Sequence, residues 1–268
     1  GGQGVDHGDD DEDHMHPAVE VITRVLDAAG VLLLDRRDGV RLHALDTIRV
    51  AAASLASYPK LLHPRLHDLW PSLRRRLDDS NPNCCIRAVE VITDVCLAAG
   101  DFFALRFRQD VWPRFIEILS TAPSPDHAGL TTMANRRRWA VLDSIARLNT
   151  HRPEVFAGLV NDAQTLCLRL LVTNLAGHSS RDGQVCVKTL QALVTADPYG
   201  IWSRIGGLPR PSTPCWTFRS RPHVQSLADM PGWFKVGGVH KGQVMEAVGP
   251  LLRQLGHTFK FRQDRDPS

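Results

Sequence analysis

Two pairs of similar segments recur along this chain, and this internal repetition constrains its fold more than any other feature. Residues 18–30 read AVEVITRVLDAAG and residues 88–100 read AVEVITDVCLAAG, so ten of the 13 positions are identical at an offset of 70. A second echo, DLWP at residues 68–71 and DVWP at residues 110–113, is spaced by 42 residues. Repetition on this scale indicates an architecture that stacks similar units.

The apolar pattern indicates that the repeated units are helical. From Val19 to Ala29, apolar residues recur at spacings of three and four, the period of an amphipathic α-helix. Alternating strand-like segments are hard to find before residue 200, and Gly and Pro separate the helical stretches. The sequence therefore predicts an all-α fold. Helices are expected near 18–35, 40–57, 64–77, 84–99, 103–120, 135–149, 154–175 and 183–196.

Short connections between these helices predict stacked antiparallel pairs. The turn at residues 78–82 carries Asp, Ser, Asn and Pro, which suit the end of one helix and the cap of the next. Pro71 and Pro113 fall inside the first helix of their units, and each should kink it at the same point. Trp70, Trp112 and Trp139 are expected in the core between helices.

This arrangement resembles HEAT repeats, an α-solenoid of about 40 to 47 residues per unit. Asp38 and Arg41 resemble the acidic and basic pair of a HEAT turn, and Asp79 and Arg87 occupy similar places in the next copy. More specifically, residues 40–119 are similar to the C-terminal part of the Tel-two-interacting protein one family. The order of the later pieces adds to this resemblance: ADPYGIW at 196–202, a Pro-rich segment at 209–222 and a leucine-rich helix at 244–255.

The resemblance implies a role for the chain. Members of this family are the HEAT scaffold of the Triple-T cochaperone complex, which helps to mature and stabilise phosphatidylinositol-3-kinase-related kinases with the ninety-kilodalton heat-shock chaperone machinery. The expected partners are the other HEAT-type subunits directly, and the kinases and chaperones indirectly. Family members are several times longer, so we expect a C-terminal fragment. The cytoplasm is the expected compartment, with the nucleus as a second.

The predicted organisation has five parts. They are a disordered acidic tail at 1–16, HEAT-type repeats at 17–205, a Pro- and Gly-rich extended segment at 206–242, a terminal helix at 243–257 and a disordered tail at 258–268. Trp202, Trp216 and Trp233 lie toward or within the Gly- and Pro-rich C-terminal part. Tryptophan is favoured at the centres of interfaces, so these three residues are the candidate partner-binding site.

Charge is unevenly distributed along the chain. The sequence has 32 basic and 29 acidic residues, but seven acidic residues precede the first basic one, Arg24. The Arg triplets at 74–76 and 136–138 raise the question of nucleic-acid binding. Aromatic residues are only 6% of the chain and no nucleic-acid-binding motif accompanies the triplets, so a solvated face or a surface for an acidic partner is favoured.

No enzymatic motif or cofactor motif emerges from the sequence. It contains no phosphate-binding loop, nucleophile elbow or HExxH motif, and the glycines at 237–242 have the wrong spacing for a phosphate loop. His63 and His67 could form half of a metal site, but exposed helix histidines are the favoured interpretation. The six cysteines show no CxxC spacing and are expected as buried reduced thiols. No apolar run is long enough to cross a membrane.

We therefore predict a non-catalytic scaffold without metal or cofactor. The alternative within the same fold is another HEAT or armadillo interaction scaffold, such as a transport receptor or a phosphatase scaffold. An enzyme or a nucleic-acid binder would need convergent polar residues in a pocket or a continuous stripe of arginines.

Overall fold

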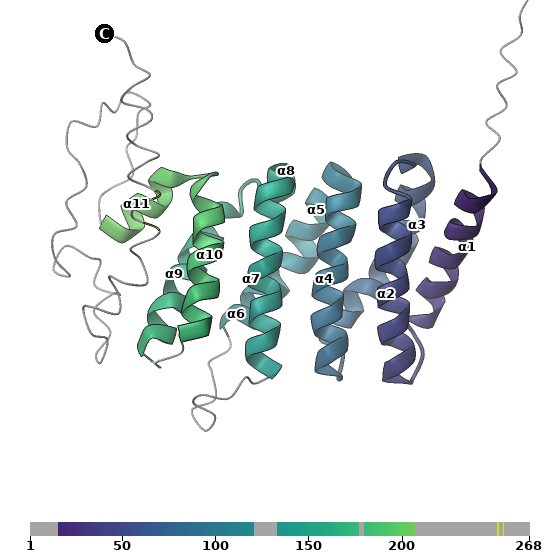
Figure 1. The fold of residues 1–268 in the computed structure, drawn as a ribbon, viewed down its shortest axis with the longest axis horizontal. Coiled ribbons are helices and arrows are strands. Elements are labelled where there is room, and N and C mark those ends of the chain that lie inside the picture. Colours follow the sequence, from purple (N-terminus) through teal and green to yellow (C-terminus); the bar gives the residue numbers. More distant parts are fainter. Residues whose placement is uncertain (1–15, 121–132, 177–179, 207–250, 252–253, 255–268) are drawn as a thin grey trace, which may run out of the picture.

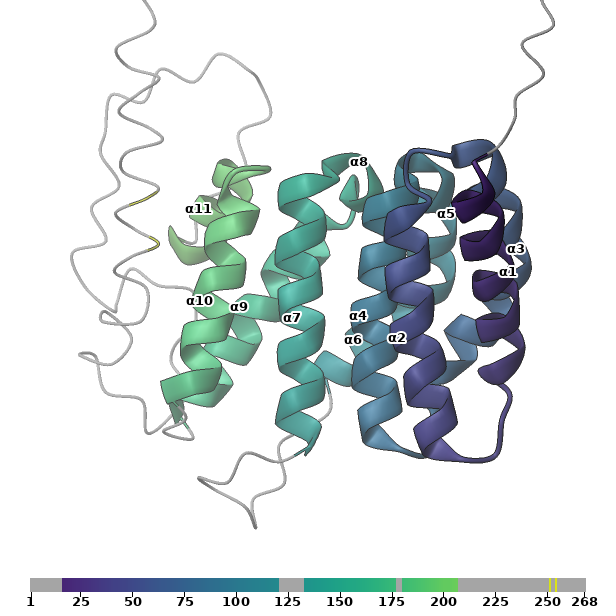
Figure 2. The ribbon, with the colours of Figure 1, turned by 45° about the vertical axis from the view of Figure 1, so that its right-hand side comes forward.

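The helices of this protein form two parallel layers (Figures 1 and 2). The computed structural model describes residues 16–120, 133–176 and 180–206, together with 251 and 254, and this part is helical with no strand. One layer contains α2 (Asp38–Ser54), α4 (Pro82–Ala99), α7 (Met133–His151) and α10 (Ser180–Val194). The other contains α1 (Pro17–Leu32), α3 (Pro59–Arg75), α6 (Trp112–Ser120) and α9 (Val160–Ala176).

Neighbouring helices of the first layer pack side by side along the array. Helix α2 packs against α4, α4 against α7, and α7 against α10, while α1 covers α2 and α9 covers α10. The first residues of α2, α4, α7 and α10 are 44, 51 and 47 residues apart. These spacings fall in or near the range of HEAT units and exceed the 34 residues of a tetratricopeptide unit. The predicted all-α solenoid of stacked helix pairs is confirmed.

Proline begins many of these helices. Its ring fixes φ near the helical value, and its missing N–H costs nothing in the first turn, where that group has no intrahelical acceptor. Helices that begin with proline are α1, α3, α4, α8 (Pro153–Phe156) and α11 (Pro198–Gly206). Helix α11 was not among the expected helices, although proline at its start is the same signal that marks the others.

Two expected helices are interrupted. The segment expected at 103–120 consists of a 3₁₀ turn (Gly100–Phe103), a short α5 (Ala104–Arg106), a π-helical turn (Phe107–Val111) and α6. The π turn directly precedes Trp112 and Pro113, where a regular helix would place the proline ring against the carbonyl four residues back. The segment expected at 154–175 is divided into α8 and α9 near Gly158. The φ of Gly158 is 81°, a backbone conformation that residues with a side chain rarely adopt.

The prolines therefore do not act alike. Pro71 lies inside α3, which continues to Arg75, whereas Pro113 is the second residue of α6. A shared kink at the same point of both helices is not what the structure shows. The neighbouring chain differs, because only the second unit has a π turn before its proline.

The two sequence echoes have different structural meanings. The 68–71 and 110–113 segments lie in the same layer of adjacent units, and the Trp70 indole Nε1 donates to Asp110 Oδ2 at 2.8 Å. The 18–30 and 88–100 segments lie on α1 and on α4 with the residue after it, which belong to opposite layers. The longer echo thus reflects a shared amphipathic pattern rather than equivalent places in the repeat.

Aromatic side chains fill the centre of the array, where the helices of the second layer are shortest. Phe103, Phe107, Phe115 and Phe156 are fully buried. The Phe107 ring meets those of Phe115 and Phe156 at centroid distances of 5.6 and 6.3 Å. Trp70 and Trp112 are buried as predicted. Trp139 is only half-buried, so the prediction that it lies in the core is confirmed only in part.

Candidate partner-binding surface

The three predicted tryptophans fall at or beyond the end of the described array. Trp202 lies in α11, but its side chain is not among the described atoms, and Trp216 and Trp233 lie outside the described residues. So do the segments predicted as 206–242, 243–257 and 258–268, apart from Gly206, Leu251 and Gln254, and nearly all of the 1–16 tail. The partner-binding role of the three tryptophans therefore stays a prediction.

The backbone that carries Trp202 is firmly held. Asp197 Oδ1 accepts a hydrogen bond from the Gly200 N–H at 2.9 Å, which caps the start of α11. Gln164 Nε2 on α9 donates to the Asp197 carbonyl at 2.9 Å. Arg204 reaches back to α9, donating to Thr165 Oγ1 at 3.0 Å. The ADPYGIW sequence therefore folds as a capped helix start docked on α9.

A buried ionic cluster joins the first two units. The Arg41 guanidinium on α2 donates two hydrogen bonds to Asp79 in the next unit, from Nε at 2.8 Å and from Nη2 at 2.7 Å. The same side chain contacts Asp38 at 2.6 Å and the carbonyl oxygens of Asp35 and Arg36 at 3.0 Å. Bidentate pairing of this kind fixes geometry as well as charge.

Asp79 is the centre of this cluster. Its side chain is 1% exposed, and it also accepts from Arg76 Nη1 at 2.8 Å and from the Asn81 backbone N–H at 2.9 Å. Burial alone would raise the pKa of Asp79, but the hydrogen bonds from Arg41 and Asn81 outweigh it and the pKa is lowered. The predicted Asp38–Arg41 pair is thus present, and its second acid comes from the following unit.

Arg87 has a different role from the one its position in the repeat indicated. It pairs with Asp46 on α2 at 3.2 Å and with Glu90 at 2.7 Å, and it takes no part in the Asp79 cluster. Further along the layer Arg147 pairs with Asp94, and Thr93 Oγ1 donates to Ser144 Oγ at 2.7 Å. Adjacent helices of this layer are therefore tied by polar side chains as well as by the apolar core.

The outer side of α1 and α2 is the most apolar described surface. Six of the exposed large apolar residues belong to this helix pair or the turn between its helices: Val21, Val25, Val31, Leu32, Leu34 and Val50. A groove of about 370 Å³ runs between the two helices, lined mainly by Ile22, Val25, Val50 and Ala51. Exposed apolar patches mark interaction surfaces, so this is the described surface best suited to protein contact.

This surface lies on a helix pair at one end of the described first layer. Helix α4 lies between α2 and α7, and α7 lies between α4 and α10, whereas α2 has a first-layer neighbour on one side only among the described residues. The outer face of the α1–α2 pair is apolar, which suits contact with another protein surface. The run VLLL at 31–34 was a signal for this in the sequence, because a single buried stripe cannot accommodate so many apolar residues.

The arginine triplets do not form a continuous exposed stripe. Arg74 and Arg75 are exposed, but Arg76 is buried and bonded to Asp79. In the second triplet Arg136 is exposed and Arg138 is buried. This arrangement argues against the nucleic-acid alternative, which needs basic side chains along one accessible surface.

His63 and His67 contact other side chains, and the described cysteines are buried. His63 stacks on the Phe102 ring at a centroid distance of 4.3 Å, and His67 contacts Arg106. Five of the six cysteines are free and buried, which confirms the prediction for them. They are Cys84, Cys85, Cys96, Cys167 and Cys186. Cys215 lies outside the described residues. Within the described chain, no helix is both long and apolar enough to cross a membrane.

Comparison with known proteins identifies similar sequences. A family model described as the TTI1 C-terminal TPR domain matches residues 3–202. The chain is 31% identical over 154 residues to the human TELO2-interacting protein 1 homolog and 30% identical over 164 residues to the mouse protein of the same name. These alignments cover 56% and 60% of this chain, which spans only 14% and 15% of those relatives. No solved structure matches.

Proposed function

The chain belongs to the family of the TTI1 C-terminal TPR domain, and from this premise we propose that it is a non-catalytic scaffold of a Triple-T-like cochaperone complex. In this role it supports the maturation and stability of phosphatidylinositol-3-kinase-related kinases. The observation that carries the proposal is the match of residues 3–202 to this family, together with stacked helix pairs, which present long surfaces to partner proteins.

The proposed direct partners are other helical-repeat subunits, beginning with a TELO2-type protein. The relatives named TELO2-interacting protein 1 homolog support this choice. The kinases and the chaperone machinery would be reached indirectly through the complex. We propose the cytoplasm as the working compartment, with the nucleus as a second.

Co-purification tests the proposal. The affinity-tagged chain is expected to capture a TELO2-type protein from a lysate, and mass spectrometry of the captured proteins distinguishes this role from that of a transport receptor or phosphatase scaffold. Capture of transport cargo or of a phosphatase subunit in place of a TELO2-type protein would contradict it.

The same assay tests the tryptophan site. Trp202→Ala, Trp216→Ala and Trp233→Ala are each expected to weaken capture while helicity by circular dichroism stays unchanged, because an interface anchor contributes to binding rather than to the folded array. Wild-type capture by all three variants would contradict the site and leave the scaffold role standing.

A further inference from the structure

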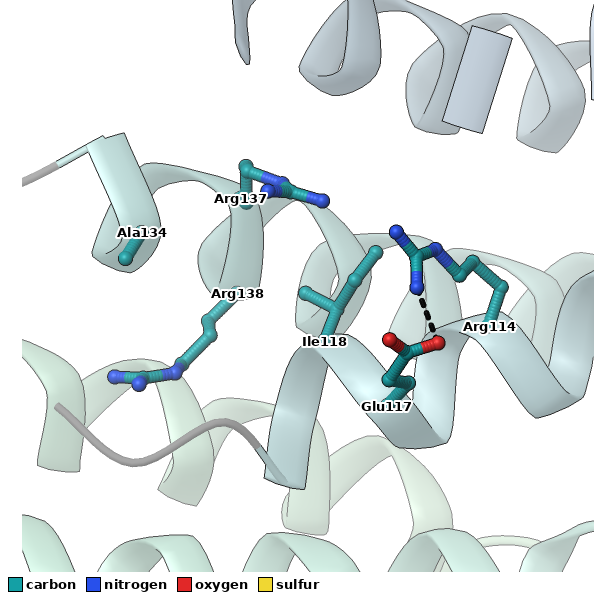
Figure 3. A pocket seen from close by; sticks show the side chains of 6 residues that line it. All are labelled: Arg114, Glu117, Ile118, Ala134, Arg137 and Arg138. Atoms are coloured by element: carbon teal, nitrogen blue, oxygen red, sulfur yellow. Dashed lines mark ion pairs between the residues drawn. The ribbon is translucent and has the colours of Figure 1, made fainter. Parts of the chain in front are cut away.

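A small cavity between α6 and α7 is lined by three arginines. Its volume is about 160 Å³, and its walls are Arg114, Glu117 and Ile118 from α6 and Ala134, Arg137 and Arg138 from α7. Figure 3 shows Arg114 and Arg137 extending toward one another above Ile118, while Arg138 extends to the other side. Arg114 and Arg137 therefore approach the cavity from facing helices.

Only some of the N–H donors of Arg114 have an acceptor among the described residues. It forms ion pairs with Asp78, at 2.6 Å, and with Glu117, and its hydrogen bond to Glu117 lowers the pKa of that carboxyl. Both acids are therefore already engaged by Arg114. The Arg114 Nε–H is buried and has no acceptor among the described residues. A buried donor without an acceptor is costly, so this atom is poised to bond to something else.

Arg137 is half-buried and forms no direct ion pair among the described residues, although its positive charge helps to lower the pKa of the Glu117 carboxyl at longer range. Three other half-buried arginines each pair with a carboxylate: Arg65 with Asp27, Arg87 with Asp46 and Arg147 with Asp94. The Arg137 Nε–H is also buried without an acceptor in the described chain. Arg137 lies within hydrogen-bonding reach of the Cys85 thiol, but burial raises the pKa of that thiol, so the thiol supplies no negative charge.

These observations specify the chemistry of a ligand. Three arginines, Glu117 and the neighbouring Asp78 leave one positive charge around the cavity. Guanidinium groups with unused N–H donors match the oxygens of a phosphoryl group, which carries close to two negative charges at neutral pH. The cavity is too small for a nucleotide, and none of the described residues that line it is an aromatic on which a base could stack.

We propose that this cavity binds a phosphoryl group carried by a serine or threonine of a protein partner. The inference rests on the proposed scaffold function, because a protein-binding array is the setting in which such a group would be presented. Arg137 supplies the main contact, and Arg114 Nε supplies a second donor from the facing helix. Phosphorylation of the partner would then add charge-assisted hydrogen bonds to the complex.

Thermal unfolding of the whole chain with O-phospho-L-serine tests the site at constant ionic strength, with inorganic phosphate and serine as parallel probes. Phosphoserine is expected to raise the wild-type Tm, because a ligand of the folded state stabilises it, while serine does not. Arg137→Gln is expected to weaken phosphoserine binding by about tenfold or more, the effect of losing a charged hydrogen bond. Arg136→Gln is the matched control: the same charge is removed from the exposed neighbouring residue, and binding is retained.

A second variant guards against misfolding of the first. Ala134 is an exposed residue in the first turn of α7, so Ala134→Glu should be tolerated there and would give Arg137 an internal carboxylate. It is expected to abolish the phosphoserine shift without lowering the ligand-free Tm. An equal loss in Arg136→Gln and Arg137→Gln, a Tm shift with inorganic phosphate but none with phosphoserine, or no wild-type shift would each overturn the proposal.

The outcome is separable from that of the proposed function. A chain that captures the TELO2-type protein but shows no phosphoserine shift loses only this inference. A chain that binds phosphoserine through Arg137 but captures no such partner loses only the scaffold assignment.

Discussion

Asp79 links the first two units of the array through a buried carboxylate. It joins Arg41 of one unit to Arg76 and Asn81 of the next, and its carboxylate is 1% exposed. Removing one partner of a buried ion pair costs far more than removing an exposed one, because the remaining charge is left without compensation. The Arg65–Asp27 pair, at 3.4 Å with an exposed Asp27 carboxylate, provides the contrast within the same molecule.

Asp79→Asn keeps the shape of the side chain but removes the charge that Arg41 and Arg76 face. We expect the free energy of unfolding to fall by about 2 to 3 kcal/mol, less than a complete loss because Arg41 retains Asp38 and two carbonyl oxygens. Asp27→Asn, the control, should cost less than about 1 kcal/mol. Urea unfolding followed by circular dichroism measures both, and equal losses would refute the central role of Asp79.

The same variant has a defined pH dependence. The folded-state pKa of Asp79 lies below its ordinary value of 3.8, so its ionised form stabilises the fold above that value and the benefit is lost as the pH falls through the folded pKa. The stability difference between wild type and Asp79→Asn should therefore be constant from about pH 7 to 5 and narrow below about pH 4. A difference that widens in acid would contradict this assignment.

Residue-scale prediction from sequence was limited by the register between units. The Asp38–Arg41 pair is local, three residues apart on one helix, and could be predicted from spacing. The contact from Arg41 to Asp79 spans 38 residues and depends on how two helix pairs stack. The DLWP and DVWP echo placed Trp70 and Asp110 in equivalent helices, but their hydrogen bond became apparent only once those helices were side by side.

Individual helices begin and end where local chemistry dictates, and α11 is the clearest case. At Gly200 an added Cβ would lie 2.2 Å from Asp197 Oδ2 and 2.8 Å from Gln164 Oε1. The glycine therefore permits both the cap of α11 and the docking of this turn on α9. This requirement also explains why the ADPYGIW segment forms a capped helix rather than a simple turn.

Gly200→Ala is expected to destabilise the α11 end by about 1 to 2 kcal/mol, the cost of a lost helix cap, because Asp197 must move. Gly39→Ala is the matched control in the first turn of α2, where an added Cβ meets nothing within 4 Å. That change should be neutral or stabilising by up to about 1 kcal/mol, since alanine favours helix. Thermal unfolding compares the two, and a neutral Gly200→Ala would contradict the tight turn.

Element-scale prediction succeeded where the signal was local. Proline at helix starts and the apolar period located α1, α4 and α7 within a few residues. It failed between residues 100 and 111, where 3₁₀, α and π turns follow one another. These turns place Phe103 and Phe107 in the shared core. The apolar periodicity of one segment carries no information about packing against other segments.

At the scale of the whole molecule, stability should vary along the array. In a solenoid each unit contacts only its neighbours, so a central helix is held from both sides and a terminal one from fewer. Helix α4 packs against α2, α3 and α7, and none of its residues after Asn83 is exposed. Helix α11 is short and contacts α9 and α10.

Amide hydrogen exchange should follow this gradient, with the slowest exchange in α4 and faster exchange toward α11, because local opening of an end breaks fewer contacts.

Gly200→Ala should accelerate exchange in α9 and α11 while leaving α4 unchanged, whereas Asp79→Asn should accelerate exchange in α2 and α4 first. Such separate responses are expected only if the units are coupled through their nearest neighbours. Uniform acceleration across all the helices in either variant would instead show a single cooperative block, and would refute the solenoid description of its energetics.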